Sequence, residues 1–199
     1  MLVSIGIPAH NEEKNIGKLL SRLLQEKFFF DLKEIIVVAS GCTDGTEKIV
    51  DSFSRKDRRV RLVSEKERKG KTSAVNLILK KSKGDIIVFI CADNIPEKGS
   101  INRLVRRLLI DNAKAASGRP IPFHGKNTLL NCISHLIWDL HHEICLINPK
   151  ICGELFAIRN RIVDEVPHYI INDDSYITAF LRKDKHKIIY VPEAVTYML

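Results

Sequence analysis

The chain has 199 residues, a length that suits one domain with a buried core. Hydrophobic residues make up 45% and charged residues 28%, a balance that excludes an intrinsically disordered chain. The formal net charge of +8 predicts an anionic partner, such as phosphates, nucleic acid or an acidic membrane surface, although a solvated lysine-rich surface would also explain it.

Cysteine usage and apolar run lengths narrow the class of protein. The five cysteines are scattered, their spacing fits neither a zinc ribbon nor a redox motif, and their odd number argues against a disulfide framework. The amino terminus enters an apolar strand pattern directly and carries no signal peptide, and no apolar run reaches the length of a membrane span. We therefore expect a reduced, cytoplasmic protein, with a location at the inner face of the membrane left open.

The first half alternates strand and helix patterns. Short apolar runs at 2–7, 35–38, 60–63 and 86–90 predict strands, and amphipathic segments between and after them predict helices. We expect Pro8 to end the first strand and Asn11 to cap the first helix. This order predicts an α/β fold with a mostly parallel sheet and helices on both faces.

The most informative stretch is residues 84–97. Five apolar residues, Ile86 to Ile90, predict a strand buried on both faces, and the polar group Ala92-Asp93-Asn94 and Pro96 end it. Ligands bind at this edge of an open α/β sheet. A carboxylate there is costly unless it is solvated, paired or bound to a cation such as Mg²⁺. The alternative is that Asp93 only caps the following helix.

Two loops in the first half have the character of anion sites. The polar turn 39–46 opens a helix and lacks the ending of a Walker loop. Arg68, Lys69 and Lys71 come just before the amino terminus of the next helix, where their charges match the helix dipole poorly unless an anion lies between them. They predict a phosphate clamp, with a solvated loop as the alternative.

The second half is predicted to contain a weak strand at 113–122, a long helix at 129–147, a strand at 152–158, a further helix and a last strand at 188–191. In the long helix His135, Asp139 and His142 share a face, which fits a metal site or, as we favour, a polar stripe. Its apolar residues and Trp138 also fit interfacial membrane contact. Asp173 and Asp174 open the next helix as an N-cap or as a second functional carboxylate pair.

Seven segments together resemble the family-2 glycosyltransferases of the GT-A fold: IPAHNEE, VVASGCTDGT, RKGKTSAVN, IVFICADNIP, GELFAIRN, NDD and IIYVPEA. They occur in the family's order and span nearly the whole chain. The resemblance implies one GT-A catalytic domain over residues 1–199, with a mostly parallel central sheet flanked by helices. It implies that residues 1–112 form the nucleotide-sugar-binding half and residues 113–199 the acceptor-side half.

The resemblance also implies an activity: transfer of a sugar from a nucleoside-diphosphate sugar to an acceptor hydroxyl, with inversion and with help from Mg²⁺ or Mn²⁺. In this family the last acid of a DxD motif binds the metal, and that acid is Asp93. The second acid of a Glu-Asp pair is the catalytic base, which makes Asp174 the base and Asp173 its neighbour. The implied donor-binding residues are Pro8, Ala9, His10 and Glu12 beside the base and ribose, Ser40 in the turn over the base, Arg68 and Lys71 facing the nucleotide, and Arg159 on the acceptor or diphosphate side.

Three departures from the family pattern matter. Cys91 replaces the first acid of the DxD motif. Ala39 and Ser40 occupy the positions of an acidic pair that reads uracil in relatives, so the base stays open. The chain ends at Leu199, soon after IIYVPEA, whereas many relatives continue with amphipathic or membrane helices and a basic motif containing Trp. We expect either a compact or a truncated form.

Other functions remain as alternatives. A nucleotide-sugar-binding domain with weak or no turnover would account for Cys91, Ala39 and the short carboxyl end. A sugar nucleotidyltransferase would need a Gly-rich basic loop after the first strand, where this chain has PAHNEE. A nucleic-acid binder is not expected, because the basic residues are not interleaved with stacking aromatic residues. The acceptor is expected to be a carbohydrate or a lipid-linked molecule.

Overall fold

A computed structural model describes residues 1–125 and 127–199. The strands are β1 (Leu2–Ala9), β2 (Asp31–Ser40), β3 (Val60–Glu65), β4 (Ile86–Ile90), β5 (Asn94–Pro96), β6 (Ala115–Pro122), β7 (Leu155–Arg159) and β8 (Ile188–Met198). The helices are α1 (Ile16–Gln25), α2 (Thr46–Lys56), α3 (Lys71–Lys81), α4 (Ser100–Ile110), α5 (Leu129–Ile147) and α6 (Asp173–Lys183).

The strands form one sheet in the order β3-β2-β1-β4-β7-β6-β8-β5. β3, β2, β1 and β4 are parallel neighbours, and β6 is parallel to β8. β7 runs antiparallel between β4 and β6, and the short β5 pairs antiparallel with β8. Because β1, β2 and β4 run in the same direction, the residues that follow them lie at one edge of the sheet.

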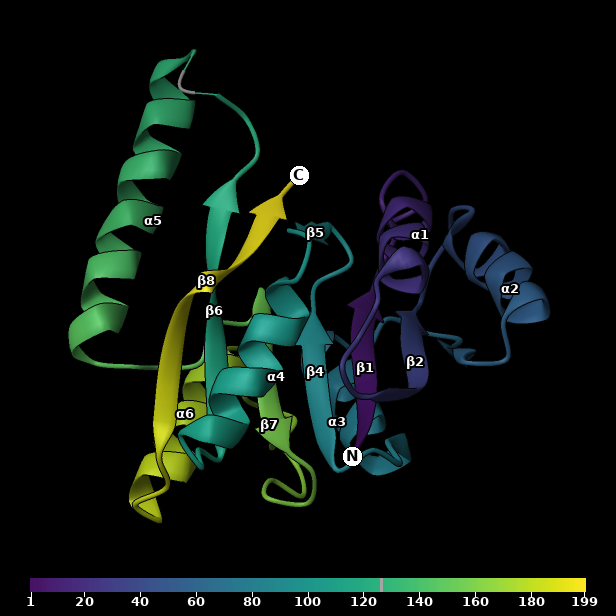
Figure 1. The fold of residues 1–199 in the computed structure, drawn as a ribbon. Coiled ribbons are helices and arrows are strands. Elements are labelled where there is room, and N and C mark those ends of the chain that lie inside the picture. Colours follow the sequence, from purple (N-terminus) through teal and green to yellow (C-terminus); the bar gives the residue numbers. More distant parts are fainter. Residues whose placement is uncertain (126) are drawn as a thin grey trace.

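Helices cover both faces of the sheet, as the alternation of strands and helices predicts (Figure 1). Along β4, Ile86, Val88 and Ile90 point into one core with α1, α2 and α4. Ile87 and Phe89 point into the other core with α3 and α6. A strand buried on both faces reads as a continuous apolar run, which explains the pattern at 86–90.

Close packing of α3 on the sheet fixes the position of its first turn. A Cβ at Gly6 of β1 would overlap the side chain of Ile78 in α3, so glycine allows the helix to approach the strand. Each α3 residue adds about 1.5 Å along the helix axis. The contact therefore carries Lys71, the first residue of α3, toward the carboxyl ends of β1 and β4.

Several predicted element boundaries are wrong. β1 continues through Pro8 to Ala9, with Pro8 opposite Val38 in the parallel register. Asn11 is not the cap of α1, because it has a φ of 56° and the N-cap position is Asn15. A short polar side chain tolerates this left-handed conformation.

The boundaries near Asp93 also differ from prediction. α4 begins at Ser100 after Gly99, so Asp93 does not cap that helix. Pro96 lies in the edge strand β5 rather than after all strands, and β8 passes through Pro192 to Met198. Edge strands tolerate proline, which has no N–H to donate. Among the described residues no helix is long and apolar enough to cross a membrane.

Candidate active site

A cavity of about 250 Å³ opens at the edge of the sheet where β1, β2 and β4 end. Its lining includes Gly70, Ala74, Cys91 and Ala92. It also includes eight of the nine donor-binding residues that the sequence predicts: Pro8, Ala9, His10, Glu12, Ser40, Arg68, Lys71 and Asp93. These residues come from three strand ends and one basic loop, so the fold gathers them from positions 85 residues apart.

The loops after β1 and β2 are tied together on one side of the cavity. His10 donates from Nδ1 to the Ser40 carbonyl at 2.7 Å, and Asn11 accepts from the Thr43 backbone N–H at 2.8 Å. The Ser40 hydroxyl oxygen accepts from the Lys69 backbone N–H at 3.2 Å, which joins the basic loop to this wall. The Ser40 O–H remains a donor for a ligand acceptor atom.

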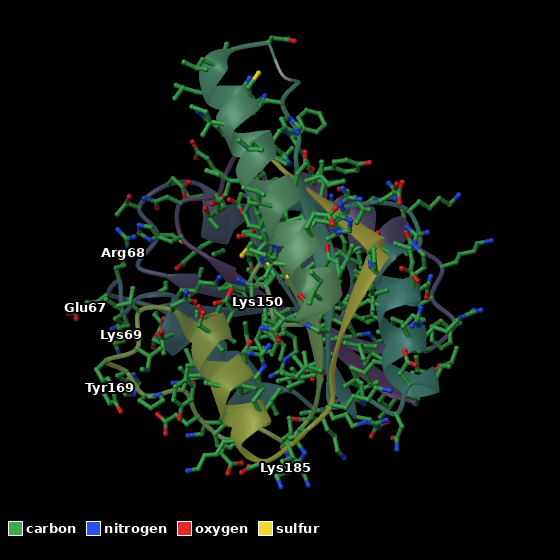
Figure 2. The ribbon with its side chains drawn as sticks, turned by 90° about the vertical axis from the view of Figure 1, so that its left-hand side faces the viewer. Glu67, Arg68, Lys69, Lys150, Tyr169 and Lys185 are labelled. Carbon is green, nitrogen blue, oxygen red and sulfur yellow. The ribbon has the colours of Figure 1, made fainter. Side chains whose placement is uncertain are left out.

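The basic loop that carries Arg68 is exposed at the side of the molecule. Figure 2 shows Arg68 and Lys69 on this loop, with Tyr169 on a second loop beside it. Thr72 at the start of α3 donates from Oγ1 to the Ile170 carbonyl at 2.8 Å, so the second loop is attached to the helix. An arginine on such a rim can reach an anion at the cavity mouth.

Glu12 brings a carboxylate to the cavity wall. Its backbone N–H donates to Thr46 Oγ1 at 2.7 Å, and its Oε2 accepts from Asn15 Nδ2 at 2.9 Å. Partial burial raises the pKa of Glu12, against the lowering effect of the Asn15 hydrogen bond and with a further rise from Asp93. The cavity therefore places two acids close enough to repel each other.

A second acidic cluster lies where β4 meets β7. One ligand atom from each of Cys91, Asp93 and Glu154 lies within 4.8 Å of the others, the one such group found within residues 1–125 and 127–199. The sequence did not single out Glu154. Its only signal was its place before the apolar run of β7, and it becomes informative once β7 is known to run antiparallel to β4.

The donor set of this cluster suits a hard cation. The Cys91 thiol donates to the Gly153 carbonyl at 3.2 Å, and burial raises the pKa of Cys91, so the sulfur stays protonated. Mg²⁺ and Mn²⁺ prefer oxygen ligands, which the carboxylates of Asp93 and Glu154 supply. The residues present therefore fit a divalent cation bound through oxygen.

Lys71 links the cavity to the predicted catalytic acids. Its Nζ lies 3.8 Å from Asp173 Oδ1. Burial disfavours the charged amine, but nearby Cys91, Asp173 and the other acids outweigh that effect and raise the pKa of Lys71. Because the Cys91 thiol stays protonated, the carboxylates are the groups that hold the ammonium charged.

Asp173 and Asp174 occupy the first turn of α6, and Asn172, not either acid, is the N-cap. Asp173 is 3% exposed, and burial raises its pKa against the lowering effect of Lys71. Asp174 Oδ2 accepts from the Gly153 backbone N–H at 2.8 Å. Asp173 Oδ2 and Asp174 Oδ1 are buried without a hydrogen-bond partner in the described part of the chain.

One predicted site residue lies elsewhere. Arg159 pairs with Ile86 at the start of β4, the end of the strand opposite to Asp93. Its guanidinium donates to the Ala113 carbonyl at 3.1 Å. Arg159 does not line this cavity, because β7 is antiparallel to β4 and its carboxyl end points away from the cavity.

The three polar residues of α5 do not form a metal cluster in the described structure. His135 bonds the His124 carbonyl at 2.7 Å, Asp139 lies 3.8 Å from Arg119 and His142 bonds the Tyr190 hydroxyl at 2.9 Å. The preferred prediction of a polar stripe fits these separate partners.

The model of glycosyl transferase family 2 matches residues 4–166. The chain belongs to this family. It is 32% identical over 210 residues to the probable glycosyltransferase YdaM of Bacillus subtilis, an alignment that covers 98% of this chain and 50% of YdaM. The chain covers 50% of YdaM, 38% of the glycosyltransferase GlyG of Streptococcus pneumoniae and 33% of the glycosyltransferase AglE of Haloferax volcanii, so it spans half or less of these relatives.

Solved structures agree with this family assignment and confirm the expected GT-A fold. The mannosyltransferase PcManGT from Pyrobaculum calidifontis, in complex with GDP-Man and Mn²⁺, has a TM-score of 0.79 and 23% identity, covering 98% of this chain and 56% of that one. Glucosyl-3-phosphoglycerate synthase from Mycobacterium tuberculosis, in complex with Mn²⁺, UDP and phosphoglyceric acid, has a TM-score of 0.69 and 25% identity, covering 100% of this chain and 70% of that one.

Proposed function

We propose that the chain transfers a sugar from a nucleoside-diphosphate sugar to an acceptor hydroxyl, with inversion at the anomeric carbon. The observation that supports this most is the gathering of eight predicted donor residues on one cavity. The carboxylates of Asp173 and Asp174 lie beside the cavity, joined to it through Lys71 and Gly153. On this proposal the first half of the chain holds the nucleotide and the second half receives the acceptor.

The diphosphate is the group that Lys71 and Arg68 would hold. Lys71 stays charged among the acids, and Arg68 projects from the loop at the cavity rim. A divalent cation held by Asp93 and bound to the diphosphate would supply Lewis-acid stabilisation for charge on the leaving group. Arg68 and Lys71 would add charge-assisted hydrogen bonds that strengthen as that charge develops.

Asp174 is the general base of this proposal. Its Oδ2 is held by the Gly153 N–H, and its Oδ1 has no hydrogen-bond partner among the described residues, so the carboxylate keeps an unused acceptor oxygen for the proton of the acceptor hydroxyl. A hydroxyl deprotonated there attacks from the side opposite the leaving diphosphate. One displacement of this kind inverts the anomeric configuration. Asp173, paired with Lys71, would position both groups.

Donor identity can be tested by thermal shift. The panel is UDP, GDP, CDP and ADP, each with and without Mn²⁺, because a ligand that binds only the folded state raises the melting temperature. The neighbouring structures contain GDP-Man or UDP, which makes GDP and UDP the first choices. We expect one nucleotide to give a Mn²⁺-dependent shift that Asp93→Asn abolishes. No shift with any nucleotide would contradict the donor site.

The runner-up function is a nucleotide-sugar-binding domain with weak or no turnover, favoured by Cys91 at the DxD position. Asp174→Asn separates the two functions. For a transferase, the substitution should leave nucleotide binding intact and reduce the rate of sugar release from the identified donor class by about 10²-fold or more, since a positioned base contributes about that much. Binding without any turnover in the unsubstituted chain would favour the runner-up function.

We also propose that α5 contacts an anionic lipid surface. Its polar side faces the sheet: His142 bonds Tyr190 of β8, and Cys145 is buried. Its exposed side chains are mostly apolar, at Leu129, Leu130, Ile133, Leu136, Ile137, Leu140, Ile144 and Ile147, and also include the acids Asp139 and Glu143. α5 stands at the near side of the molecule in Figure 2. An apolar helical face together with a net charge of +8 fits a membrane interface.

Vesicle flotation tests this contact. The chain should float with anionic vesicles and less with zwitterionic ones, and the double substitution Ile137→Ser with Leu140→Ser should abolish flotation. Ile110→Ser on α4 is the matched control, because Ile110 is also exposed but lies on another element. Flotation that survives the double substitution would contradict the proposal, as would a dimer in solution that the same double substitution dissociates.

A further inference from the structure

Position 91 of the DxD motif carries a thiol that hydrogen bonding already engages. Cys91 follows directly after β4, and its Sγ donates to the Gly153 carbonyl at 3.2 Å. A sulfur atom engaged in this way is a poor ligand for Mg²⁺ or Mn²⁺, which prefer oxygen. Asp93 is then the one carboxylate that positions 91–93 offer to a cation.

The antiparallel pairing of β4 with β7 brings a replacement acid to the same place. Ile90 lies opposite Leu155, so the next residue of each strand in this direction, Cys91 and Glu154, are also opposite. The backbone confirms this, because the Cys91 N–H donates to the Glu154 carbonyl at 3.3 Å. The Glu154 side chain thereby reaches the cluster with Asp93.

A buried amide fixes the Glu154 carboxylate. Asn94 is fully buried, and its Nδ2 donates to Glu154 Oε2 at 2.7 Å and to the Glu154 carbonyl at 3.1 Å. Such a hydrogen bond to a ligating carboxylate orients it and restricts its rotamer. The Asn94 that follows Asp93 in the sequence thus holds the second acid next to the first.

The charges around the cluster favour a cation. Asp93 and Glu154 bring two carboxylates together, and Asp173 and Asp174 lie close to Lys71. Lys71 Nζ lies 3.8 Å from Asp173 Oδ1, and Glu154 and Asp174 also raise the pKa of Lys71, so one ammonium faces several carboxylates. Adjacent carboxylates repel unless a counter-charge lies between them.

We propose that Glu154 is the second protein ligand of the divalent cation and takes the role that Cys91 cannot fill. This inference rests on the proposed donor site and assigns to it a carboxylate from the second half of the chain. Asp93 and Glu154 would bind the cation from two strands, and the donor diphosphate would complete its oxygen ligands.

Binding of Mn²⁺ itself, measured by the loss of its free electron-paramagnetic-resonance signal, tests the assignment without an activity assay. Titrations use Mn²⁺ alone and Mn²⁺ with GDP or UDP. Glu154→Gln keeps an acceptor oxygen for Asn94 and removes the charge, so the fold should be retained. We expect it to weaken Mn²⁺ binding about tenfold or more, as Asp93→Asn should. Binding of the nucleotide without Mn²⁺ should be unchanged.

Glu165→Gln is the control for loss of one negative charge. Glu165 is an exposed acid whose recorded partner is His168, 3.3 Å away, and it does not line the cavity. It should leave Mn²⁺ binding unchanged. Wild-type Mn²⁺ affinity in Glu154→Gln, with loss of affinity in Asp93→Asn, would overturn this inference alone. Absence of Mn²⁺ and nucleotide binding in the unsubstituted chain would overturn the proposed donor site as well.

Discussion

Gly153→Ala perturbs the candidate site through a single methyl group. The new Cβ would lie 2.8 Å from Lys71 Nζ and 3.3 Å from Asp174 Oδ2, whereas ordinary contacts begin at 3.4 Å. The ammonium must therefore move, and it reaches ordinary contact after 0.6 Å, the difference between 3.4 and 2.8 Å. Because Nζ ends a flexible chain, the cost to folding should stay below about 1 kcal/mol, a change of about 2–4 °C in melting temperature at most.

The expected effect on ligand binding is larger than the effect on folding. Lys71 displaced from its position would lose a charge-assisted hydrogen bond to the diphosphate worth about 1.5–3 kcal/mol, so Kd should rise about 10- to 150-fold. Calorimetric titration with the nucleotide selected by the thermal-shift panel, in the presence of Mn²⁺, measures this directly. Gly17→Ala in α1 is the control, because its Cβ meets only ordinary contacts. An unchanged Kd in a fully folded Gly153→Ala protein would refute the role of Lys71.

Further substitutions test the fold that carries the site. Phe156→Ala should cost about 3–5 kcal/mol in urea unfolding, since its ring is 1% exposed and stacks on Phe89 at 4.7 Å. Gly6→Ala should cost about 1–3 kcal/mol by overpacking β1 against α3, and retained wild-type stability would contradict the packing described. Asp44→Asn should destabilise by about 1 kcal/mol near neutral pH by weakening the hydrogen bonds that Asp44 accepts from Thr46 and Glu13. Burial raises the pKa of Asp44, but the hydrogen bonds outweigh it, so the pKa in the folded protein is lowered. The stabilisation that Asp44 provides is therefore present above its unfolded pKa and is lost as the pH falls through its folded pKa. The difference in unfolding free energy between the two proteins should therefore be present at neutral pH and disappear at acid pH.

The candidate donor cavity could be predicted from the sequence because it depends on parallel strands. Apolar runs identify β1, β2 and β4, and parallel strands end at one edge, so the polar residues after each run must meet. Asp93 follows from this rule alone, whereas His10 and Ser40 are predicted from the resemblance to the family. The rule needs no knowledge of which strand lies beside which, since the direction of the strands already gathers the loops.

Residues on β7 could not be placed by the same rule. β7 enters the sheet antiparallel beside β4, a pairing between segments about 65 residues apart that local pattern does not encode. Its direction puts Glu154, which had no predicted role, near the cavity edge and Arg159 at the opposite edge, away from its expected place. The long helix shows a similar limit, because periodicity predicts an amphipathic α5 but not that its polar side faces the protein.

Gly153 joins the cation side of the candidate site to the base side. Its carbonyl accepts from Cys91, its N–H donates to Asp174, and its missing side chain leaves room for Lys71. An aspartate at position 91 would face the Gly153 carbonyl without a proton to donate, so the thiol is better suited to hold this backbone in place. With cysteine in place of the acid, the thiol holds the Gly153 backbone, and the Gly153 N–H in turn holds Asp174. On our proposal, the carboxylate that the motif lacks is that of Glu154 on the adjacent strand.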